Sequence, residues 1–364
     1  MLVKQLKLHN FRNHIDTNVD FCNGINILQG QNGQGKTNLV ESLMVAATTK
    51  SPRTSKDADM VCFDAEQANV EIIIERKYGN VIVEYVVDKQ NGKTFKINHN
   101  EIKKISDVFG NLVAVYFSPD ELKIVSDSPN ERREFMDTEI SMLSGTYYNL
   151  LQRYTKVLSE RNKLLKTERN RSVLLAQIEV WNEQLSMLAA PIVKTRKAFV
   201  QKLKVPASEA LKYLSKQTES LDIEYVGAKG ETIDEIKKEV QAALEYNLEK
   251  DIELGYTSIG PHRDDIRFLL SGTDARSFAS NGQQRSIVLA LKLAEATIFE
   301  QELGEPPILV FDDVFSELDA RRQAKLYEVI SKYQSIITGT NFKFKKDAAY
   351  SSYKVKNGIV KRAK

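Results

Sequence analysis

Cysteine is scarce in this chain of 364 residues: only Cys22 and Cys62 are present, and both lie in apolar, strand-like surroundings. Two such thiols supply neither a disulfide framework nor the spacing of a metal site. No apolar run approaches the roughly 18 residues that a membrane span needs. The start of the chain, MLVKQLKLHNF, alternates like a β-strand and lacks the pattern of a signal peptide. We therefore expect a cytoplasmic protein without a membrane partner.

Net charge is also small, because 52 Lys and Arg oppose 49 Asp and Glu, which leaves a formal balance of +3. A field that weak gives no reason to expect nucleic acid as a partner. The distribution of charge along the chain is more informative. Seven basic and two acidic residues lie between positions 153 and 171, a local excess of five positive charges. This segment is the first candidate for contact with phosphate groups.

The first third of the chain is typical of β-structure. Residues 2–11 and 17–29 alternate or run apolar, and residues 70–87 predict a hairpin that turns near Gly79. A helix that begins near Lys36 interrupts these strands. We therefore expect an antiparallel β subdomain beside the first helix.

From residue 129 to about residue 247 the pattern becomes helical. Apolar residues at spacings of three and four predict two long helices that form a hairpin with its tip near residues 166–172. Arg161 interrupts the apolar seam of the first helix, and Pro191 is expected to bend the second. Neither helix exceeds about 50 residues, so at about 1.5 Å per residue this is a short arm.

After residue 255 strands alternate with helices again, which implies a largely parallel sheet. The expected strands are residues 264–270, 306–312 and 334–340, the expected helices are residues 283–302 and 320–332, and a hairpin is expected at residues 353–361. We therefore predict an α/β fold in three parts. Residues 1–119 form the first part of a nucleotide-binding head, residues 120–250 an inserted helical arm, and residues 251–364 the rest of the head.

The octapeptide GQNGQGKT, residues 30–37, matches the phosphate-binding pattern G-x-x-x-x-G-K-[ST] in full. It follows an apolar strand and opens a helix, which is the context that the motif requires. Its glycines let backbone N–H groups turn toward a β-phosphate at the positive end of a helix. Lys36 neutralises phosphate oxygens, and the Thr37 hydroxyl binds Mg²⁺. The residues expected to bind nucleotide here are Gly30, Gln31, Asn32, Gly33, Gln34, Gly35, Lys36 and Thr37.

The stretch ILVFDDVFSELD, residues 308–319, supplies a carboxylate. Four apolar residues followed by Asp312 predict a buried strand that delivers this acid to the sheet edge where ligands bind. Asp312 would complete the Mg²⁺ site with Thr37, and Asp313 would orient or deprotonate a water. Adjacent acids at a strand end are also common turn formers, and Asp319 can cap the next helix.

A small polar turn precedes a long apolar helix in SFASNGQQRSIVLALKLAE, residues 277–295. The ordinary interpretation is a helix cap, because Ser280 and Gln283 fit a capping box and Gly282 eases the turn. The alternative uses the same N–H groups and the helix dipole as a second anion site, with Ser280 donating to a γ-phosphate. Since the glycine loop already wraps one face of its own nucleotide, this site would close on a nucleotide held by another copy. That alternative predicts an ATP-dependent homodimer with nucleotide contacts from Ser280, Gly282 and Gln283.

These motifs, with LKLHNFRN, YFSPDELKIV, SPNERREFMD and SIGPHRDD, occur in one family's order over nearly the full length. The sequence resembles the RecF family of bacterial recombination-mediator ATPases, which is related to ABC-type and structural-maintenance-of-chromosomes (SMC) heads. The resemblance implies an ABC-type P-loop ATPase head that binds ATP and Mg²⁺ and carries an inserted short helical arm. It makes residues 30–37 the Walker A loop, Asp312 the Walker B carboxylate, residues 280–283 the signature motif and residues 316–319 a loop at the dimer interface. Lys36, Ser280 and Asp313 are then the expected catalytic residues.

The resemblance also implies a function in DNA repair. It predicts binding to DNA at single-strand/double-strand junctions, loading of RecA with RecR and RecO, and a weak, DNA-dependent ATPase that resets an ATP-induced dimer. The candidate DNA contacts are Arg132, Arg133, Arg153, Lys156, Lys163 and Lys166. The alternative for each of them is an ordinary position on a solvent-exposed helix face. Arg12 and Arg263 are further candidates, although His262 and Arg263 would equally serve as buried partners of Asp264 and Asp265.

At several positions the sequence differs from the related ATPase heads, and each difference leads to a prediction. Asp313 stands where transporter-type heads usually have Glu, and its shorter reach is consistent with slow hydrolysis. No His follows the strand at residues 334–340, which leaves γ-phosphate sensing to Thr338 or Thr340, and Asn281 stands where Gln is expected. Two other classes stay open: a kinase-like enzyme, which needs an acceptor pocket, and a transporter ATPase subunit, which needs a membrane partner.

Overall fold

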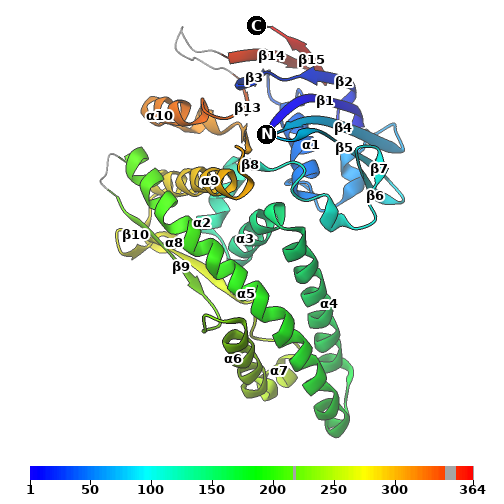
Figure 1. Ribbon diagram of the computed structural model, residues 1–364, viewed down its shortest axis with the longest axis vertical. Helices are drawn as coiled ribbons and strands as arrows, with labels where there is room; N and C mark the ends of the chain where they lie inside the picture. Colours follow the sequence, from blue (N-terminus) through cyan, green and yellow to red (C-terminus); the bar gives the residue numbers. More distant parts are fainter. Residues whose placement is uncertain (216–218, 341–349, 364) are drawn as a thin grey trace. The chain divides into compact units, whose positions relative to one another are not determined.

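The computed structural model describes residues 1–215, 219–340 and 350–363 (Figure 1). Two compact units make up the chain: unit 1 is Met1–Glu121 with Leu289–Lys364, and unit 2 is Leu122–Val288. The second boundary differs from the sequence-based division, because residues 251–288 lie in unit 2 with the arm rather than with the head. Among the described residues, no helix is both long enough and apolar enough to cross a membrane.

The first sheet of unit 1 has six strands in the order β15-β14-β3-β13-β12-β8, and among them only the β14–β15 pair is antiparallel. Its strands are β3 (Ile25–Gln29), β8 (Ala114–Phe117), β12 (Ile308–Asp312), β13 (Ser335–Gly339), β14 (Tyr350–Lys356) and β15 (Ile359–Arg362). Every residue of β8, β12 and β13 is buried, as expected for parallel strands covered on both faces. The predicted parallel sheet is confirmed, and it aligns the carboxyl ends of β3 and β12.

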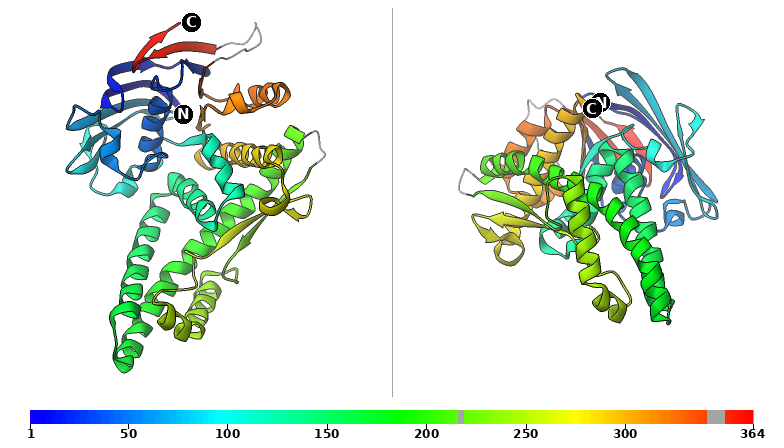
Figure 2. Two further views of the ribbon diagram at one scale, coloured as in Figure 1. Left: turned by 180° about the vertical axis from the view of Figure 1, so that it is seen from behind. Right: turned by 60° about the horizontal axis from the view of Figure 1, so that its bottom comes forward.

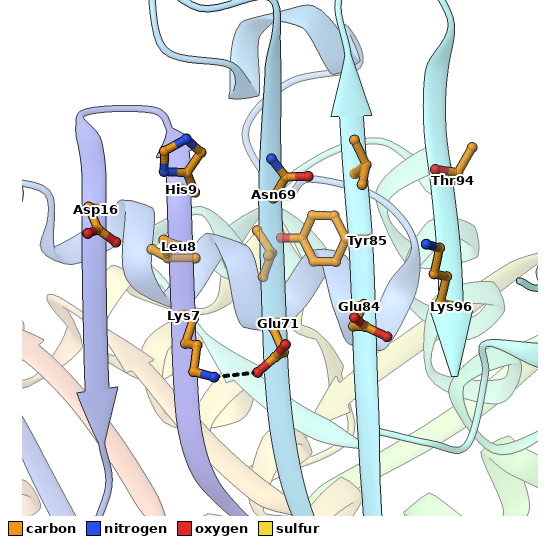
Figure 3. Close-up of a pocket in the computed structure, with 12 residues that line it drawn as sticks. Lys7, Leu8, His9, Asp16, Asn69, Glu71, Glu84, Tyr85, Thr94 and Lys96 are labelled. Atoms are coloured by element: carbon orange, nitrogen blue, oxygen red, sulfur yellow. Dashed lines mark hydrogen bonds and ion pairs between the residues drawn. The ribbon is translucent and has the colours of Figure 1, made fainter. Parts of the chain in front are cut away.

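The second sheet of unit 1 is antiparallel, in the order β2-β1-β4-β5-β6-β7. Its strands are β1 (Leu2–Phe11), β2 (His14–Asp20), β4 (Gln67–Arg76), β5 (Gly79–Asp88), β6 (Gly92–Ile97) and β7 (Asn100–Glu101). Alternate residues such as Leu6, Leu8 and Ile72 are buried, while the opposite face carries charged side chains, including the Lys7–Glu71 pair at 2.7 Å (Figure 3). Helix α1 (Lys36–Thr48) contacts β5 of this sheet and β8, β12 and β13 of the parallel sheet.

Shorter helical segments complete unit 1. These are α10 (Ala320–Ile330) and the 3₁₀ turns η1 (Asp57–Met60), η2 (Ile105–Asp107), η3 (Pro119–Leu122, which reaches the unit boundary) and η4 (Val314–Glu317). The predicted cap of α10 is confirmed, because the Asp319 carboxylate accepts from the N–H groups of Arg321 and Arg322 at 3.1 and 2.9 Å.

Unit 2 contains the predicted helical hairpin, formed by α4 (Gly145–Thr167) and α5 (Arg171–Ser215), which lie side by side in both views of Figure 2. The turn between them falls within the predicted tip. Helix α5 has 45 residues, about 68 Å at about 1.5 Å per residue, and continues through Pro191. The other helices are α2 (Lys123–Ser126), α3 (Pro129–Leu143), α6 (Ile233–Tyr246), α7 (Leu248–Leu254), α8 (Ala275–Phe278) and α9 (Asn281–Leu303), within which the unit boundary falls.

A small antiparallel sheet of unit 2, in the order β11-β10-β9, corrects two predictions. Strand β10 (Asp265–Leu270) is confirmed as a strand, but it pairs with β9 (Leu221–Val226) and β11 (Thr273–Asp274) instead of joining the parallel sheet. Strand β9 lies in a region that was expected to be helical throughout. Its apolar residues alternate, with Leu221 and Ile223 buried; β10 pairs with its backbone, and helix α5 packs against it.

Candidate nucleotide-binding site

The glycine loop between β3 and α1 adopts a conformation that its glycines alone permit. Gly33 and Gly35 have φ values of 78° and 108°, in the left-handed region. A Cβ at Gly30 would lie 2.3 Å from the carbonyl oxygen of Val355, and one at Gly35 would lie 2.7 Å from Oδ1 of Asn13. A side chain would therefore strain the backbone at Gly33, crowd the loop at Gly30, and do both at Gly35.

Lys36 begins helix α1 and is 3% exposed. Its ammonium Nζ donates to the carbonyl oxygens of Gly30 and Gln31 at 2.9 and 3.0 Å, so the lysine lies along its own loop. The tip of the loop, Gln31 to Gly33, is exposed. An exposed turn of N–H groups beside a buried cation is the arrangement that holds a polyphosphate.

Asp312 is the last residue of β12. In the folded chain it lies beside the phosphate loop, although the two are far apart in the sequence. Its Oδ1 accepts from the hydroxyls of Thr37 at 3.0 Å and Thr338 at 2.6 Å, and its Oδ2 accepts from the Tyr116 hydroxyl at 3.3 Å. Burial raises the pKa of this carboxyl, and the charge of Asp313 acts in the same direction, while the three hydroxyls oppose both. A carboxylate beside a P-loop threonine fits a Mg²⁺ site, because both oxygen types suit that cation.

Two partners of Asp312 were not predicted in that role. Thr338 was expected to sense a γ-phosphate, but its hydroxyl donates to Asp312 and accepts from the N–H of Asp313 at 3.0 Å. Tyr116 belongs to β8, which pairs in parallel with β12. The apolar run of β8 indicated a buried strand, but nothing in it indicated which strand would lie beside it.

Asp313 follows the sheet edge with φ 55°, a left-handed conformation that Asp tolerates better than most residues. Its N–H is held by Thr338, and its carbonyl oxygen accepts from the Ser316 hydroxyl at 2.7 Å. Neighbours thus fix the backbone on both sides of this half-buried acid. A residue held in a sparsely populated conformation beside a binding loop is a candidate for function.

The start of α9 forms the predicted capping box. The N–H of Gln283 donates to Oγ of Ser280 at 3.3 Å, and the N–H of Ser280 donates to Oε1 of Gln283 at 2.9 Å. The amide nitrogen of Gln283 also donates to Oε1 of Glu219 at 2.9 Å. Ser280, Asn281 and Gly282 are exposed, and no atom lies within 4 Å of a Cβ built on Gly282. The predicted helix cap is therefore formed, and the same turn is exposed and could contact another molecule.

The six candidate DNA contacts divide into two groups. Arg132 is 3% exposed and its guanidinium donates to both carboxylate oxygens of Asp265, at 2.6 and 3.1 Å, so it belongs to an internal ion pair, contrary to its prediction as a DNA contact. Arg133 is half-buried and donates to the carbonyl oxygen of Asp264 at 2.7 Å, and burial lowers its pKa. The other four candidates are all exposed on α4: Arg153, Lys156, Lys163 and Lys166.

A shallow groove runs along this face of α4. Its lining includes Lys163 and Lys166 together with the hydroxyl-bearing residues Thr155, Ser159 and Thr167. Ammonium and hydroxyl groups are the side chains that bind phosphate oxygens of nucleic acids. Arg161 of the same helix is fully buried against Asp251 at 2.8 Å, so the positive charge on the surface is smaller than the sequence count suggested.

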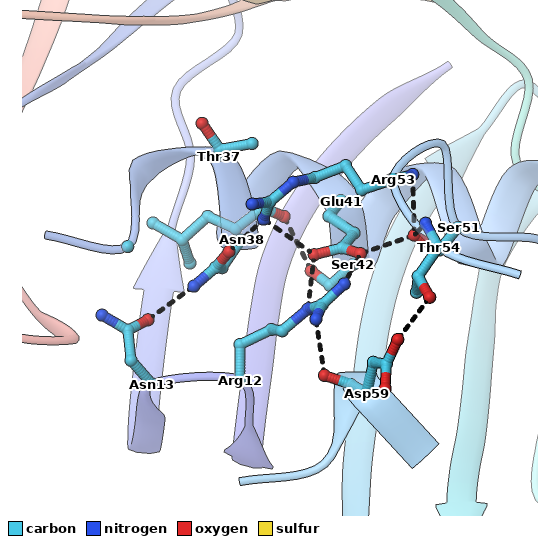
Figure 4. Close-up of polar contacts among 12 residues, drawn as sticks. Arg12, Asn13, Thr37, Asn38, Glu41, Ser42, Ser51, Arg53, Thr54 and Asp59 are labelled. Carbon is cyan, nitrogen blue, oxygen red and sulfur yellow. Dashed lines mark hydrogen bonds and ion pairs between the residues drawn. The ribbon is translucent and has the colours of Figure 1, made fainter. Parts of the chain in front are cut away.

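Arg12 and Arg263, the further candidates, differ in exposure. Arg12 donates to both carboxylate oxygens of Glu41, which is 0% exposed on α1, at 2.9 and 2.5 Å, beside Arg53 (Figure 4). Arg12 is thus engaged in an internal ion pair. Arg263 is exposed and lies over the ring of Tyr256 at 5.0 Å.

His262 lies inside unit 2, but its partners differ from the predicted ones. It bonds to the Tyr154 hydroxyl at 2.6 Å and to the carbonyl oxygen of Thr257 at 3.0 Å, and burial lowers its pKa to about 4. The carboxylates predicted to hold it are engaged elsewhere, because Asp264 accepts from the Tyr225 hydroxyl and Asp265 from Arg132.

The fold and the site define an ABC-type P-loop ATPase head. A family model described as "RecF/RecN/SMC N terminal domain" matches residues 2–361. The DNA replication and repair protein RecF of Alkaliphilus oremlandii (strain OhILAs) is 38% identical over 351 residues, 95% of this chain and 95% of that protein. The same protein of Clostridium botulinum (strain ATCC 19397 / Type A) is 38% identical over 366 residues, 100% of each chain. The chain belongs to the RecF family.

Solved structures agree with this assignment. The structure of the recombination mediator protein RecF-ATP in the RecFOR pathway matches with a TM-score of 0.91 and 32% identity, covering 100% of this chain and 97% of that one. The Smc head domain of Pyrococcus furiosus, bound to the C-terminal domain of ScpA, matches with a TM-score of 0.57 and 16% identity, covering 99% and 95%. The second likeness is one of fold alone.

Proposed function

We propose that this protein is an ATP-switched DNA-binding protein of recombinational repair and replication-fork maintenance. One observation carries the proposal: a chain with a complete phosphate loop also begins α9 with an exposed, open turn, Ser280 to Gly282. Two anion-binding helix starts in one chain suit a nucleotide shared between two copies. Membership of a family that includes ATP-bound RecF supports the same function.

In this proposal the glycine loop and Lys36 hold the phosphates of ATP. Thr37 and Asp312 hold Mg²⁺, whose charge would offset negative charge on the phosphate oxygens. Asp313 orients or deprotonates the attacking water from its fixed backbone. The short reach of an Asp at this position is consistent with slow turnover, so hydrolysis serves to end a bound state.

ATP-dependent dimerisation is the proposed output of the site. Ser280 and the N–H groups around Gly282 would contact the γ-phosphate held by another copy, and Gln283 would keep the turn in place through its bonds to Ser280 and Glu219. ATP shifts the population toward the dimer because it touches the α9 start only in the closed state. In the cap the Ser280 hydroxyl only accepts a hydrogen bond, so its own proton would be free to donate to a phosphate oxygen.

DNA is the proposed macromolecular partner. The exposed cations of α4 and the hydroxyls of its groove would bind phosphates without reading sequence, with an affinity that falls steeply with salt. Preference for single-strand/double-strand junctions, DNA-stimulated hydrolysis and RecA loading with RecR and RecO are proposed on family membership. A cytoplasmic location agrees with this role.

The dimer is tested by measuring molar mass in solution with Mg²⁺ and a non-hydrolysable ATP analogue. We expect the parent chain to dimerise only with nucleotide, Lys36→Ala to stay monomeric because it binds nucleotide poorly, and Ser280→Arg to bind nucleotide but stay monomeric. Phe278→Ala, a change at an exposed residue before the same helix, is the matched control. A parent that is monomeric at high concentration, or a Ser280→Arg variant that dimerises normally, contradicts the proposal.

A further inference from the structure

Two hairpin turns from opposite ends of the chain hold the phosphate loop in unit 1. The turn between β1 and β2 contributes His14, whose Nε2 lies 3.0 Å from the carbonyl oxygen of Gly35. The turn between β14 and β15 contributes Gly358, whose N–H donates to the carbonyl oxygen of Gln34 at 3.0 Å. The two turns also meet each other, because Nδ1 of His14 lies 2.8 Å from the carbonyl oxygen of Gly358, 344 positions away.

These contacts fix two consecutive peptide planes of the loop. In a planar trans peptide the carbonyl group and the following N–H point in opposite directions. The bond to the oxygen of Gln34 therefore sets the direction of the Gly35 N–H. The bonds to the oxygen of Gly35, from His14 and from the N–H of Leu39 at 3.2 Å, together set that of the Lys36 N–H. Both N–H groups point away from the hairpin turns. A loop that binds anions through N–H groups loses affinity when those groups are free to rotate.

The His14 ring has partners at both nitrogens: Nε2 faces the Gly35 carbonyl, and Nδ1 faces the Gly358 carbonyl and Oγ1 of Thr17, the latter at 3.1 Å. The side chain is 0% exposed, and burial lowers its pKa, so the ring is neutral and has one N–H. It faces two carbonyl oxygens, and the Thr17 hydroxyl donates to that of Gly358 at 2.8 Å. Since Thr17 already supplies a donor to the Gly358 carbonyl, we assign the single ring proton to Nε2, facing Gly35. The fit is close, since a Cβ at Gly35 would lie 2.8 Å from Nε2 of His14.

We propose that His14 is a positioning residue for nucleotide binding: by donating from Nε2 to the Gly35 carbonyl, it aims the Lys36 N–H at the β-phosphate. It touches no phosphate itself. The inference rests on the proposed nucleotide site and adds a residue that the phosphate-loop motif does not contain. The C-terminal hairpin shares the task, which gives β14 and β15 a part in binding nucleotide.

Two amide substitutions separate the two ring nitrogens. In His14→Gln the amide nitrogen is as many bonds from Cα as Nε2, so it can still donate to Gly35, whereas in His14→Asn it is placed like Nδ1 and reaches only toward Gly358. We expect the Gln variant to bind MgADP within about 3-fold of the parent, and the Asn variant at least about 10-fold more weakly. Calorimetric titration measures both. A non-hydrolysable ATP analogue should lose the same factor, because it shares the β-phosphate.

The control is His9→Asn, on the exposed outer face of the neighbouring strand β1 (Figure 3), which should bind like the parent. Urea midpoints without nucleotide should be alike for the Gln and Asn variants, because both replace one buried polar group by another. Asn and Gln variants that bind MgADP equally well overturn the role of His14. A parent chain that binds no MgADP overturns the nucleotide site itself, which distinguishes the two failures.

Discussion

Two buried carboxylates, one in each unit, show the difference between the site and the scaffold. Asp251 of unit 2 is 0% exposed, and it accepts from the Arg161 guanidinium at 2.8 Å and from the N–H of Ser258 at 2.9 Å. Asp312 of unit 1 is 6% exposed, and its bonds come from the hydroxyls of Thr37, Thr338 and Tyr116. Within residues 1–215, 219–340 and 350–363, no Lys or Arg forms an ion pair with Asp312.

The negative charge of Asp251 is balanced by an arginine, whereas that of Asp312 still needs a cation. The charges of Arg161 and Asp251 balance each other, so both groups serve the fold of the arm. Hydroxyl donors offset only part of the cost of burying a negative charge, which is why burial raises the pKa of Asp312. A buried carboxylate held by hydroxyls alone suits a site that receives its cation from a ligand.

The largest effect is expected from breaking the complete pair. Arg161→Ala leaves Asp251 charged and buried without its partner, which typically costs about 3–5 kcal/mol. Arg153→Ala, on the exposed face of the same helix, should change stability by less than about 0.5 kcal/mol. Urea unfolding followed by circular dichroism measures both. If the two variants lose the same stability, the buried pair is not what holds α4 in unit 2.

A smaller effect of the opposite sign is expected at Asp312. Its raised pKa means that the folded chain binds a proton more tightly than the unfolded chain, so the ionised form weakens the fold at neutral pH. Asp312→Asn should therefore raise stability by about 1 kcal/mol at pH 7, and this gain should vanish as the pH falls below the ordinary carboxyl value of 3.8. The same variant should lose Mg²⁺-dependent nucleotide binding.

Asp313→Asn is the neighbouring control for this gain, since Asp313 is only half-buried. Urea midpoints at two pH values and nucleotide titrations with and without Mg²⁺ distinguish the roles. An Asp312→Asn variant that unfolds as readily as Arg161→Ala would make Asp312 a structural acid instead of a metal ligand.

The same contrast explains what the sequence could predict. The phosphate loop could be predicted from the sequence because its shape depends on a few neighbouring residues. The left-handed φ values at Gly33 and Gly35 require glycine, so the motif itself specifies the loop. The strand that ends in Asp312 was readable from its apolar run. The meeting of Thr37 and Asp312 followed from the general rule that ligands bind at the carboxyl ends of parallel strands.

Side-chain pairs between residues far apart in the sequence could not be predicted. Nothing local indicated that Arg132 would pair with Asp265, that Arg161 would be buried against Asp251, or that His14 would meet Gly358. An arginine on an amphipathic helix has the same sequence signature whether it faces solvent or an inserted strand. The strand β9 was missed for a related reason, because its short alternation is completed only by pairing with β10 and by packing against α5.

The last effect concerns binding instead of stability, and it tests what is left of the basic arm once Arg132 and Arg161 are assigned to the interior. The double variant Lys163→Glu/Lys166→Glu should weaken DNA binding by about 10-fold at low salt, because it removes two cations that attract DNA phosphates. Nucleotide affinity should be unchanged, because neither lysine belongs to the ATP site. The slope of log affinity against log salt should become shallower by about 0.9 for each phosphate that is no longer neutralised. Fluorescence anisotropy with a labelled gapped duplex measures both quantities. Lys238→Glu/Lys250→Glu, which reverses two exposed charges on α6 and α7, is matched in charge and should bind as the parent does. Equal weakening by both double variants would mean that net charge, and not the groove of α4, attracts DNA.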